Sequence, residues 1–306
     1  MPEEVSRVSL REEAAFQLAN VTKTAPQFGA ITPRWLVRFL DWKPLEAGTF
    51  RVNKVDESKV IESLCAHEDE SPLPTTFADY QDTPREYRLG SINAVLNVHT
   101  RVSDLLSNPY DQVREQLRIL IESVKEKQES ELVNNADYGL LNNVPDAQKI
   151  KTRKGAPTPD DLDELLVKVW KEPSLFLAHP RAIAAFGREC TRRGVPPPTV
   201  TLFGTPFLTW RGVPLIASDK IAIRSKDHTT KILLVRVGEK KQGVVGLFQP
   251  GLPGEQSPGL SVRFMGIDQR SLASYLVSLY CSAAVLTNDA IALLEDVNVG
   301  QYHEYK

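Results

Sequence analysis

One long amphipathic segment, residues 108–132, constrains the fold of this chain more than any other feature. Asn108 can cap a helix, and Pro109 suits the first helical position. Apolar residues then recur at helical spacing, at Val113, Leu117, Leu120, Ile121 and Val124. At 1.5 Å per residue, the helix would be about 35 to 40 Å long. Because this exceeds the usual length in globular domains, the segment predicts a spine helix.

The first 35 residues lack the means to bury themselves. Pro26 and Pro33 prevent one continuous helix, and the apolar residues are scattered. Such a segment is either a disordered tail or an arm whose core comes from a neighbouring subunit. As an arm, it would make its contacts through Leu10, Phe16, Leu18, Val21, Phe28 and Ile31.

Three shorter helices are expected. Thr32 is the candidate N-cap of the first, with Pro33 at its first position. Its apolar face would comprise Trp35, Leu36, Phe39 and Leu40. Thr158 would cap the second helix, whose apolar stripe runs to Trp170. The third spans about 180–193 and ends at Gly194, a suitable C-terminal cap.

A basic cluster and a stiff proline-rich loop follow this third helix. The segment consists of Arg192, Arg193, Gly194, Val195, Pro196, Pro197 and Pro198. Basic residues here either complement the helix C-terminus or line an opening or an interface.

The remaining segments indicate strands. Residues 49–55 and 92–98 flank a polar, proline-containing stretch at 67–88, which favours a projecting hairpin or loop. The chain after Thr199 is β-rich, with strands expected at 199–203, 207–210, 213–216, 231–237, 243–248 and 260–267. Periodicity leaves 273–286 open between helix and strand, and a short helix is expected at 288–294.

Composition and charge argue against several classes of function. A formal net charge of -2 disfavours binding to nucleic acid, which usually needs a broad positive field. The widely spaced Cys65, Cys190 and Cys281 fit a reducing cytosol. The N-terminus lacks the apolar core of a signal peptide. Residues 271–288 are uncharged over the length of a membrane span, but their serines favour a buried strand.

No pattern typical of an active site occurs. The chain contains no GxGxxG after a strand, no GxSxG and no HExxH. Cys65 and His67 lack further metal ligands, and the acids at 160–164 suit a first helical turn without a metal. We therefore expect no catalytic residue, cofactor or metal. A soluble enzyme with an unrecognised site around Asp160, Asp161 and His179 is an alternative.

Several long strings of residues resemble the family 2A encapsulins. In the first part of the chain they are 17–20 (QLAN), 31–36 (ITPRWL), 129–132 (ESEL), 137–141 (DYGLL) and 155–166 (GAPTPDDLDELL). Later strings are 176–180 (FLAHP), 186–197 (FGRECTRRGVPP) and 254–267 (GEQSPGLSVRFMGI). The strings span nearly the whole chain, so the resemblance covers more than one short motif.

The resemblance implies an α+β, Hong Kong 97-type capsid fold. Residues 1–35 would form the N-terminal arm, and 48–102 the extended loop. The peripheral domain with the spine helix would comprise 36–47, 103–158 and 230–306. The axial domain would comprise 159–229. The same pattern makes 273–286 a strand.

The resemblance also implies a structural role. The chain would be a shell protein that assembles with itself into an icosahedral nanocompartment of about 60 copies. The implied cargo is a cysteine desulfurase, which suggests sulfur metabolism in the cytoplasm. Residues 190–199 would lie near the five-fold pore, where Arg192 and Arg193 would favour small anions. A prophage major capsid protein with the same fold is an alternative, as is a membrane protein anchored by 271–288.

Overall fold

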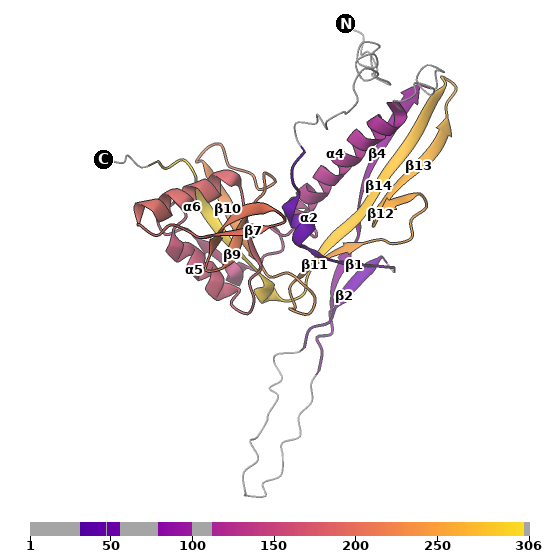
Figure 1. The fold of residues 1–306 in the computed structure, drawn as a ribbon. Coiled ribbons are helices and arrows are strands. Elements are labelled where there is room, and N and C mark those ends of the chain that lie inside the picture. The colour runs from indigo at the N-terminus through magenta and orange to yellow at the C-terminus, as the bar shows by residue number, and fades with distance from the viewer. Residues whose placement is uncertain (1–30, 47, 56–78, 100–111, 303–306) are drawn as a thin grey trace, which may run out of the picture.

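The computed structural model describes residues 31–46, 48–55, 79–99 and 112–302. They form an elongated lobe built along one long helix and a more rounded lobe beside it (Figure 1). The long helix is α4 (Gln112–Asn134), and its 23 residues extend over about 34 Å. This confirms the predicted spine helix, while its predicted start at Asn108 and Pro109 lies outside the described residues.

The elongated lobe is a six-stranded sheet covered by α4. In order, the strands are β1 (Asp41–Pro44), β11 (Val244–Phe248), β14 (Leu272–Val285), β13 (Leu260–Ile267) and β12 (Glu255–Ser257), and β4 (Gly90–His99) also pairs with β14. The β1 and β11 strands are parallel, and the other pairs are antiparallel. Val124 of α4 packs into a core with Val277, Leu279 and Cys281 of β14. Segment 273–286 is therefore a strand, as the resemblance implied.

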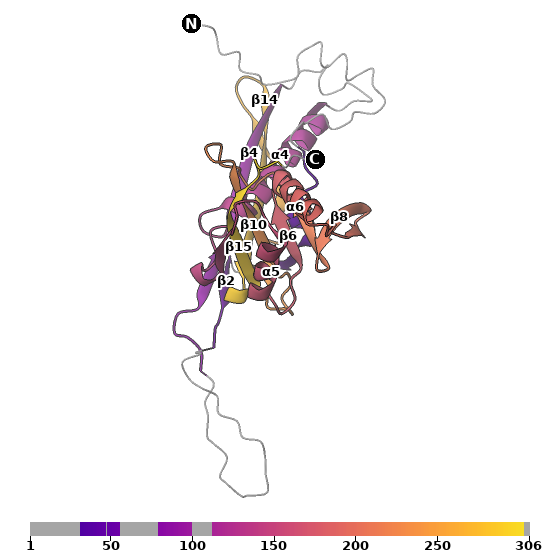
Figure 2. The ribbon, with the colours of Figure 1, turned by 90° about the vertical axis from the view of Figure 1, so that its left-hand side faces the viewer.

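The rounded lobe is built on a seven-stranded sheet. Its order is β5 (Lys149–Lys151), β15 (Ile291–Asn298), β10 (Thr229–Val235), β6 (Leu175–Ala178), β9 (Val213–Ala217), β8 (Thr205–Trp210) and β7 (Thr199–Leu202). The helices α5 (Pro159–Lys168) and α6 (Pro180–Arg192) lie against this sheet (Figure 2). Phe176 of β6 packs towards them, while its neighbours Leu175 and Leu177 pack with α2 (Trp35–Phe39) and the end of α4. Both faces of the central strands are thus buried.

The chain passes between the lobes three times, and Arg236 ties the last two passages together. Its side chain is fully buried. The guanidinium donates to the Thr287 hydroxyl at 2.8 Å and to the Asp289 carboxylate at 2.9 Å. Arg236 follows β10. Its partners Thr287 and Asp289 lie just before β15, beside and within the 3-10 turn η2 (Asn288–Ala290). A 3-10 turn earlier in the chain, η1, spans Asp146–Gln148. The ion pair of the buried Arg236 with Asp289, which is partly exposed, therefore fixes the junction of the two sheets.

A small hairpin leaves the elongated lobe. It pairs β2 (Thr49–Val52) with β3 (Arg85–Arg88) in antiparallel register. Residues 56–78 lie outside the described residues, so the extended loop at 48–102 stays a prediction. Its last part, β4, belongs to the main sheet beside β14.

Three local predictions are wrong. Thr32 does not cap α2, because its N–H and hydroxyl both donate to Glu126, and Arg34 occupies the cap position. Trp170 is 71% exposed, since α5 ends at Lys168 before the stripe reaches it. The helix expected at 288–294 is the turn η2 followed by β15. A central strand buried on both faces shows the same continuous apolar run as a buried helix.

The other helix and strand predictions agree with the structure to within a few residues. Thr158 caps α5 and shares a capping box with Asp161. The strand expected at 260–267 has those bounds as β13. Among the described residues, no helix has the length and apolarity needed to cross a membrane. Segment 271–288, the candidate anchor, is mostly β14.

The predicted domain ranges do not follow the two sheets. Both β10 and β15 share the sheet of α5 and α6, although 230–306 was expected in the peripheral domain. Strand β5 also joins this sheet from within 103–158. The division into peripheral and axial domains by residue range therefore stays a prediction.

Candidate functional site

The connection between α6 and β7 forms an exposed corner of the rounded lobe. The helix ends where Gly194 takes a left-handed conformation, with a φ of +69°. The Val195 N–H donates to the Cys190 carbonyl at 3.0 Å and closes the helix end. Gly194 thus ends α6 as predicted.

The proline run that follows is tied to the sheet at its far end. The Pro198 carbonyl accepts from the Thr209 N–H at 2.8 Å and from its hydroxyl at 3.2 Å. Pro196 and Pro198 are exposed, and Pro197 is half-buried. The loop therefore projects from a fixed base, which suits a segment that lines an opening. Its place at a five-fold pore stays a prediction.

Both arginines of this corner have acidic partners. Arg192 Nη2 lies 2.8 Å from Glu189 Oε2, and Arg193 Nη1 lies 3.3 Å from Asp160 Oδ2. Glu189 is buried beneath them. Because each guanidinium lies beside a carboxylate, the pair adds little net positive charge to the corner of one subunit. The predicted preference for small anions is therefore weaker than the sequence suggests, and it stays a prediction.

The alternative enzymatic site does not form a catalytic arrangement. His179 caps α6, with Nδ1 accepting from the Arg181 N–H at 3.0 Å, and burial lowers its pKa. Asp161 accepts from the Thr158 N–H and hydroxyl in the α5 cap. Asp160 pairs with Arg193. Each of the three side chains thus has a structural partner, and burial raises the pKa of the nearby Cys190 thiol to about 11, away from a reactive thiolate.

The acids of α5 that suggested a metal are likewise engaged. Asp163 accepts from Trp210 Nε1 at 2.7 Å and pairs with Arg211 at 3.1 Å. Glu164 pairs with Arg153 at 2.8 Å. The part of the chain that the structure describes contains no group of three or more His, Cys, Asp or Glu suited to a metal ion. Cys65 and His67 lie outside it.

A polar cluster joins the spine helix to the segment after the arm and to the rounded lobe. Glu126 accepts from the Thr32 N–H at 2.8 Å and its hydroxyl at 2.9 Å, and it lies 2.9 Å from Lys220 Nζ. Burial raises the pKa of Glu126, but these donors outweigh it and lower the pKa overall. One turn along, Glu129 accepts from the Ser218 hydroxyl at 3.1 Å.

Glu129 differs from Glu126 in its surroundings. Its side chain is buried, and its Oε2 atom has no hydrogen-bond partner among the described residues. Burial raises the pKa of Glu129 to about 7, against the lowering effect of Ser218 and Lys220. No local pattern could have revealed this cluster, because Thr32 is 94 residues from Glu126 and Ser218 is 89 from Glu129.

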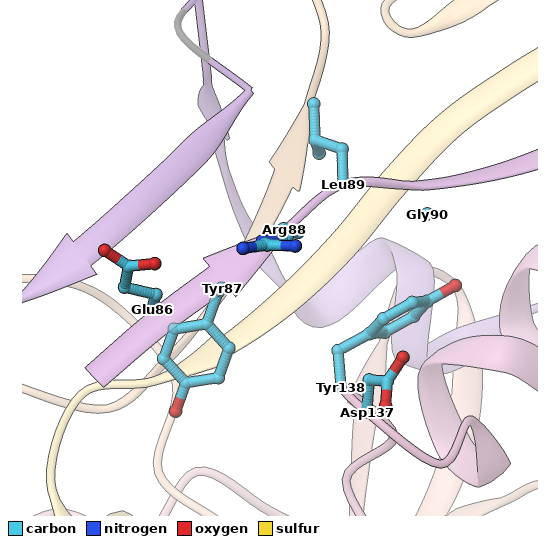
Figure 3. A pocket seen from close by; sticks show the side chains of 7 residues that line it. All are labelled: Glu86, Tyr87, Arg88, Leu89, Gly90, Asp137 and Tyr138. Carbon is cyan, nitrogen blue, oxygen red and sulfur yellow. The ribbon is translucent and has the colours of Figure 1, made fainter.

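A hollow of about 430 Å³ lies at the root of the β2–β3 hairpin (Figure 3). The Tyr138 ring approaches Gly90 so closely that a Cβ atom there would lie 2.6 Å from the tyrosine oxygen. Burial raises the pKa of Tyr138. Tyr87 donates to the Val285 carbonyl at 2.8 Å, and Glu86 pairs with Arg51. These contacts anchor the hairpin to the main sheet and account for the hollow without a ligand.

The tip of the elongated lobe exposes apolar side chains. Phe264, Met265 and Ile267 of β13, which we call the outer patch, are 58 to 60% exposed. Their strand pairs with β14 on one side, whereas β12 pairs only with Leu260 and Ser261 on the other. Contiguous exposed apolar residues are typical of a surface that another chain covers.

Comparison with known proteins identifies close relatives over the full chain. A family model described as "Type 2A encapsulin shell protein SrpI-like" matches residues 46–301. The type 2A encapsulin shell protein SrpI of Synechococcus elongatus is 65% identical over 306 residues, which cover 100% of this chain and 99% of that protein. The type 2A encapsulin shell protein of Mycobacterium leprae is 59% identical over 300 residues, 97% of each.

Solved structures show the same relationship. The cryo-EM structure of the holo-SrpI encapsulin complex from Synechococcus elongatus matches with a TM-score of 0.85 at 64% identity, covering 97% of this chain and 99% of that one. The capsid of a native GTA particle matches with a TM-score of 0.60 at 13% identity, covering 97% of this chain and 95% of that one. The second match bears on the fold alone, which is the expected Hong Kong 97-type capsid fold.

Proposed function

Since the chain belongs to the SrpI-like type 2A encapsulin shell proteins, we propose that it assembles into an icosahedral particle of about 60 copies around a cysteine desulfurase. It is a structural shell protein and not an enzyme, because its full-length relatives are shell proteins. Beyond membership of the family, the proposal states the symmetry of the particle, its copy number and its cargo. It also places the particle in sulfur metabolism in the cytoplasm.

The observation that carries the proposal is the full-length match to shell proteins at 59 to 65% identity. The outer patch supports self-assembly, because these apolar side chains stay exposed in a single subunit. A prophage capsid protein is less well supported, since the GTA capsid is only 13% identical to this chain.

The cargo rests on the family resemblance and on one relative. The solved structure of SrpI is described as a holo encapsulin complex. We therefore propose that the shell of this chain also encloses a partner protein. The family resemblance implies that this partner is a cysteine desulfurase. We also propose that residues 1–35 act as an interlocking arm, 48–102 as the extended loop, and 192–198 as the pore loop.

Co-expression with a cysteine desulfurase from the same genome tests the proposal. Electron microscopy of the purified protein should show uniform, hollow, closed particles, and the desulfurase should remain with them through size-exclusion chromatography. An unrelated pyridoxal-phosphate enzyme of similar size is the matched control and should separate. Particles without the desulfurase would contradict the cargo, and a small oligomer would contradict the shell.

The arm is tested by deleting residues 1–30. Assembly should fail, while the subunit keeps its far-ultraviolet circular dichroism and cooperative thermal unfolding, because an arm that packs on a neighbouring subunit contributes to assembly and not to the core of its own subunit. A truncated chain that still forms closed particles would contradict the arm.

A further inference from the structure

An open groove follows one flank of the spine helix. It consists of two adjoining hollows, of about 740 and 390 Å³, that share Lys125. One wall is α4 from Val113 to Gln128, and the other is formed by residues 34–42 and by parts of β11, β12, β13 and β14. At 1.5 Å per residue, the helical wall is about 22 Å long. We call this the spine groove.

The groove combines an apolar interior with a basic rim. Val113, Leu117 and Ile121 lie one turn apart on α4 and are only half-buried. Opposite them are Val262 and Tyr275, with Trp42 and Leu279 in the second hollow. Five of the lining side chains are Arg or Lys and two are Glu: Arg34, Arg38, Arg114, Arg118, Lys125, Glu115 and Glu122. Such a groove suits an apolar segment that carries acidic side chains.

We propose that residues 8–21 of this chain dock in the spine groove. The segment contains Leu10, Phe16, Leu18 and Val21, and its charged residues are Arg11, Glu12 and Glu13, which give it a net charge of -1. Its apolar side chains match the groove interior, and its acidic pair matches the basic rim. The inference rests on the proposed role of the arm and names the surface that the arm covers.

The point at which the described chain begins supports this occupant. Thr32 is hydrogen-bonded to Glu126 of α4, and Arg34 lines the groove and pairs with Glu122 at 2.7 Å. Val21 and Ile31 are ten positions apart in the sequence, and an extended chain of this length spans at most about 33 to 36 Å. That reach exceeds the length of the groove. The segment therefore enters at the groove edge with enough chain to lie along it, in its own subunit or in an adjacent one.

Disulfide trapping in the full-length chain tests the docking. Leu18→Cys is combined with Gln256→Cys, an exposed position on the groove wall, in a Cys65→Ser background. The matched control combines Leu18→Cys with Ile119→Cys, which is 44% exposed on α4 but does not line the groove. Under mild oxidation we expect a roughly tenfold higher disulfide yield for the groove pair, because docking raises the effective concentration of the two thiols.

The electrophoretic mobility of the product identifies the source of the segment. Covalent dimers and larger species indicate docking on a neighbour and support both the docking and the interlocking arm. A cross-linked single chain indicates docking within one subunit, which supports the docking and overturns the interlocking arm. Equal yields for the two pairs, or no disulfide at Gln256→Cys, would overturn it. Lys125→Glu should lower the yield several-fold, and adding Glu12→Lys and Glu13→Lys should restore it.

Electron microscopy of the same samples separates this inference from the shell function. Closed particles without the groove disulfide would overturn the docking and leave the shell intact. The groove disulfide in a protein that never forms particles would support the docking and overturn the shell.

Discussion

The two lobes differ in how completely they bury their own apolar surface. In the rounded lobe, β6, β10 and β15 form the middle of a sheet covered on both faces, and Phe176 and Leu177 are fully buried. In the elongated lobe, the outer strand β13 ends in the exposed outer patch, and α4 borders an open groove. The sheet core of the rounded lobe is therefore closed on both faces, although Val167, Trp170 and Phe203 remain exposed on its surface, whereas the elongated lobe combines an exposed apolar strand end with an open groove.

This difference predicts separate consequences for substitutions in the two lobes. A change in the rounded lobe should act on the folding of each subunit. A change at the tip of the elongated lobe should act on assembly and leave folding nearly unchanged. The following predictions test that distinction, beginning with the largest expected effect.

Replacing Phe264 and Ile267 with serine should abolish assembly. The change removes apolar contact area at each of the about 60 positions of the proposed shell, so small losses add up over the particle. The isolated subunit should lose less than about 1 kcal/mol, because both side chains are already exposed. Sedimentation measures the first effect, and urea unfolding of the unassembled variant measures the second. Val167→Ser on α5, at a site 67% exposed, is the control and should assemble.

Phe176→Ala should destabilise the subunit by about 3 to 5 kcal/mol, since it leaves a cavity in a fully buried core. The loss is measured by urea unfolding in the serine background above, where assembly does not interfere. Trp170→Ala in the same lobe is the matched control and should change stability by less than about 0.5 kcal/mol. Comparable losses of unfolding free energy for the two variants would contradict the description of a core that is buried on both faces of the rounded lobe's sheet.

Glu129→Gln should change the dependence of stability on pH. Burial raises the pKa of Glu129 from 4.5 to about 7, so the folded state retains its proton over a range in which the unfolded chain has lost it. The contribution of Glu129 to stability is therefore fully present below pH 4.5, falls between pH 4.5 and 7, and stays low above. The fall is on the order of 3 kcal/mol. In urea unfolding at pH 5 and pH 8, the Glu129→Gln variant should not show this fall in stability.

Glu131→Gln is the matched control for this titration. Lys127 and Asn135 lower the pKa of Glu131, so its contribution is present above its unfolded pKa and is lost as the pH falls. Its removal should leave the change between pH 5 and 8 nearly as in the unaltered chain. If Glu129→Gln alters the stability change between pH 5 and 8 no more than Glu131→Gln does, the raised pKa of Glu129 is contradicted.

Arg192→Ala with Arg193→Ala should produce the smallest effect on assembly and on anion entry. Both guanidiniums have acidic partners, the buried Glu189 and the exposed Asp160, so the arginines add little net positive charge to the corner. If the loop lines a pore, entry of small anions into loaded particles should slow measurably, by up to about fivefold. Lys151→Ala, at an exposed position on β5, is the control for loss of surface charge. Unchanged entry would contradict the predicted role of the two arginines.

Local signals predicted the elements that are stabilised locally. The Thr158 cap, the end of α6 at Gly194 and the bounds of β13 all follow from residues within a few positions of one another. The family resemblance, rather than periodicity, decided that 273–286 is a strand.

Long-range contacts explain what the sequence did not reveal. Thr32 has the features of an N-cap, but Glu126 of α4 binds both of its donors. Segment 291–294 is apolar at every position because both of its faces are buried, so its strand could not be told from a helix. The 192–198 segment was predicted to be a stiff loop at an opening or interface, which stays a prediction, and the pairing of its arginines with Glu189 and Asp160 required the fold.

The mass of the purified full-length chain in solution tests the central claim most directly. Sedimentation velocity should show one dominant species of about 2 MDa, which corresponds to roughly 60 copies of the 34.2 kDa chain. The same measurement on the Phe264→Ser, Ile267→Ser variant should show folded subunits or small oligomers. A full-length chain that sediments only as a monomer or small oligomer would contradict the self-assembling shell.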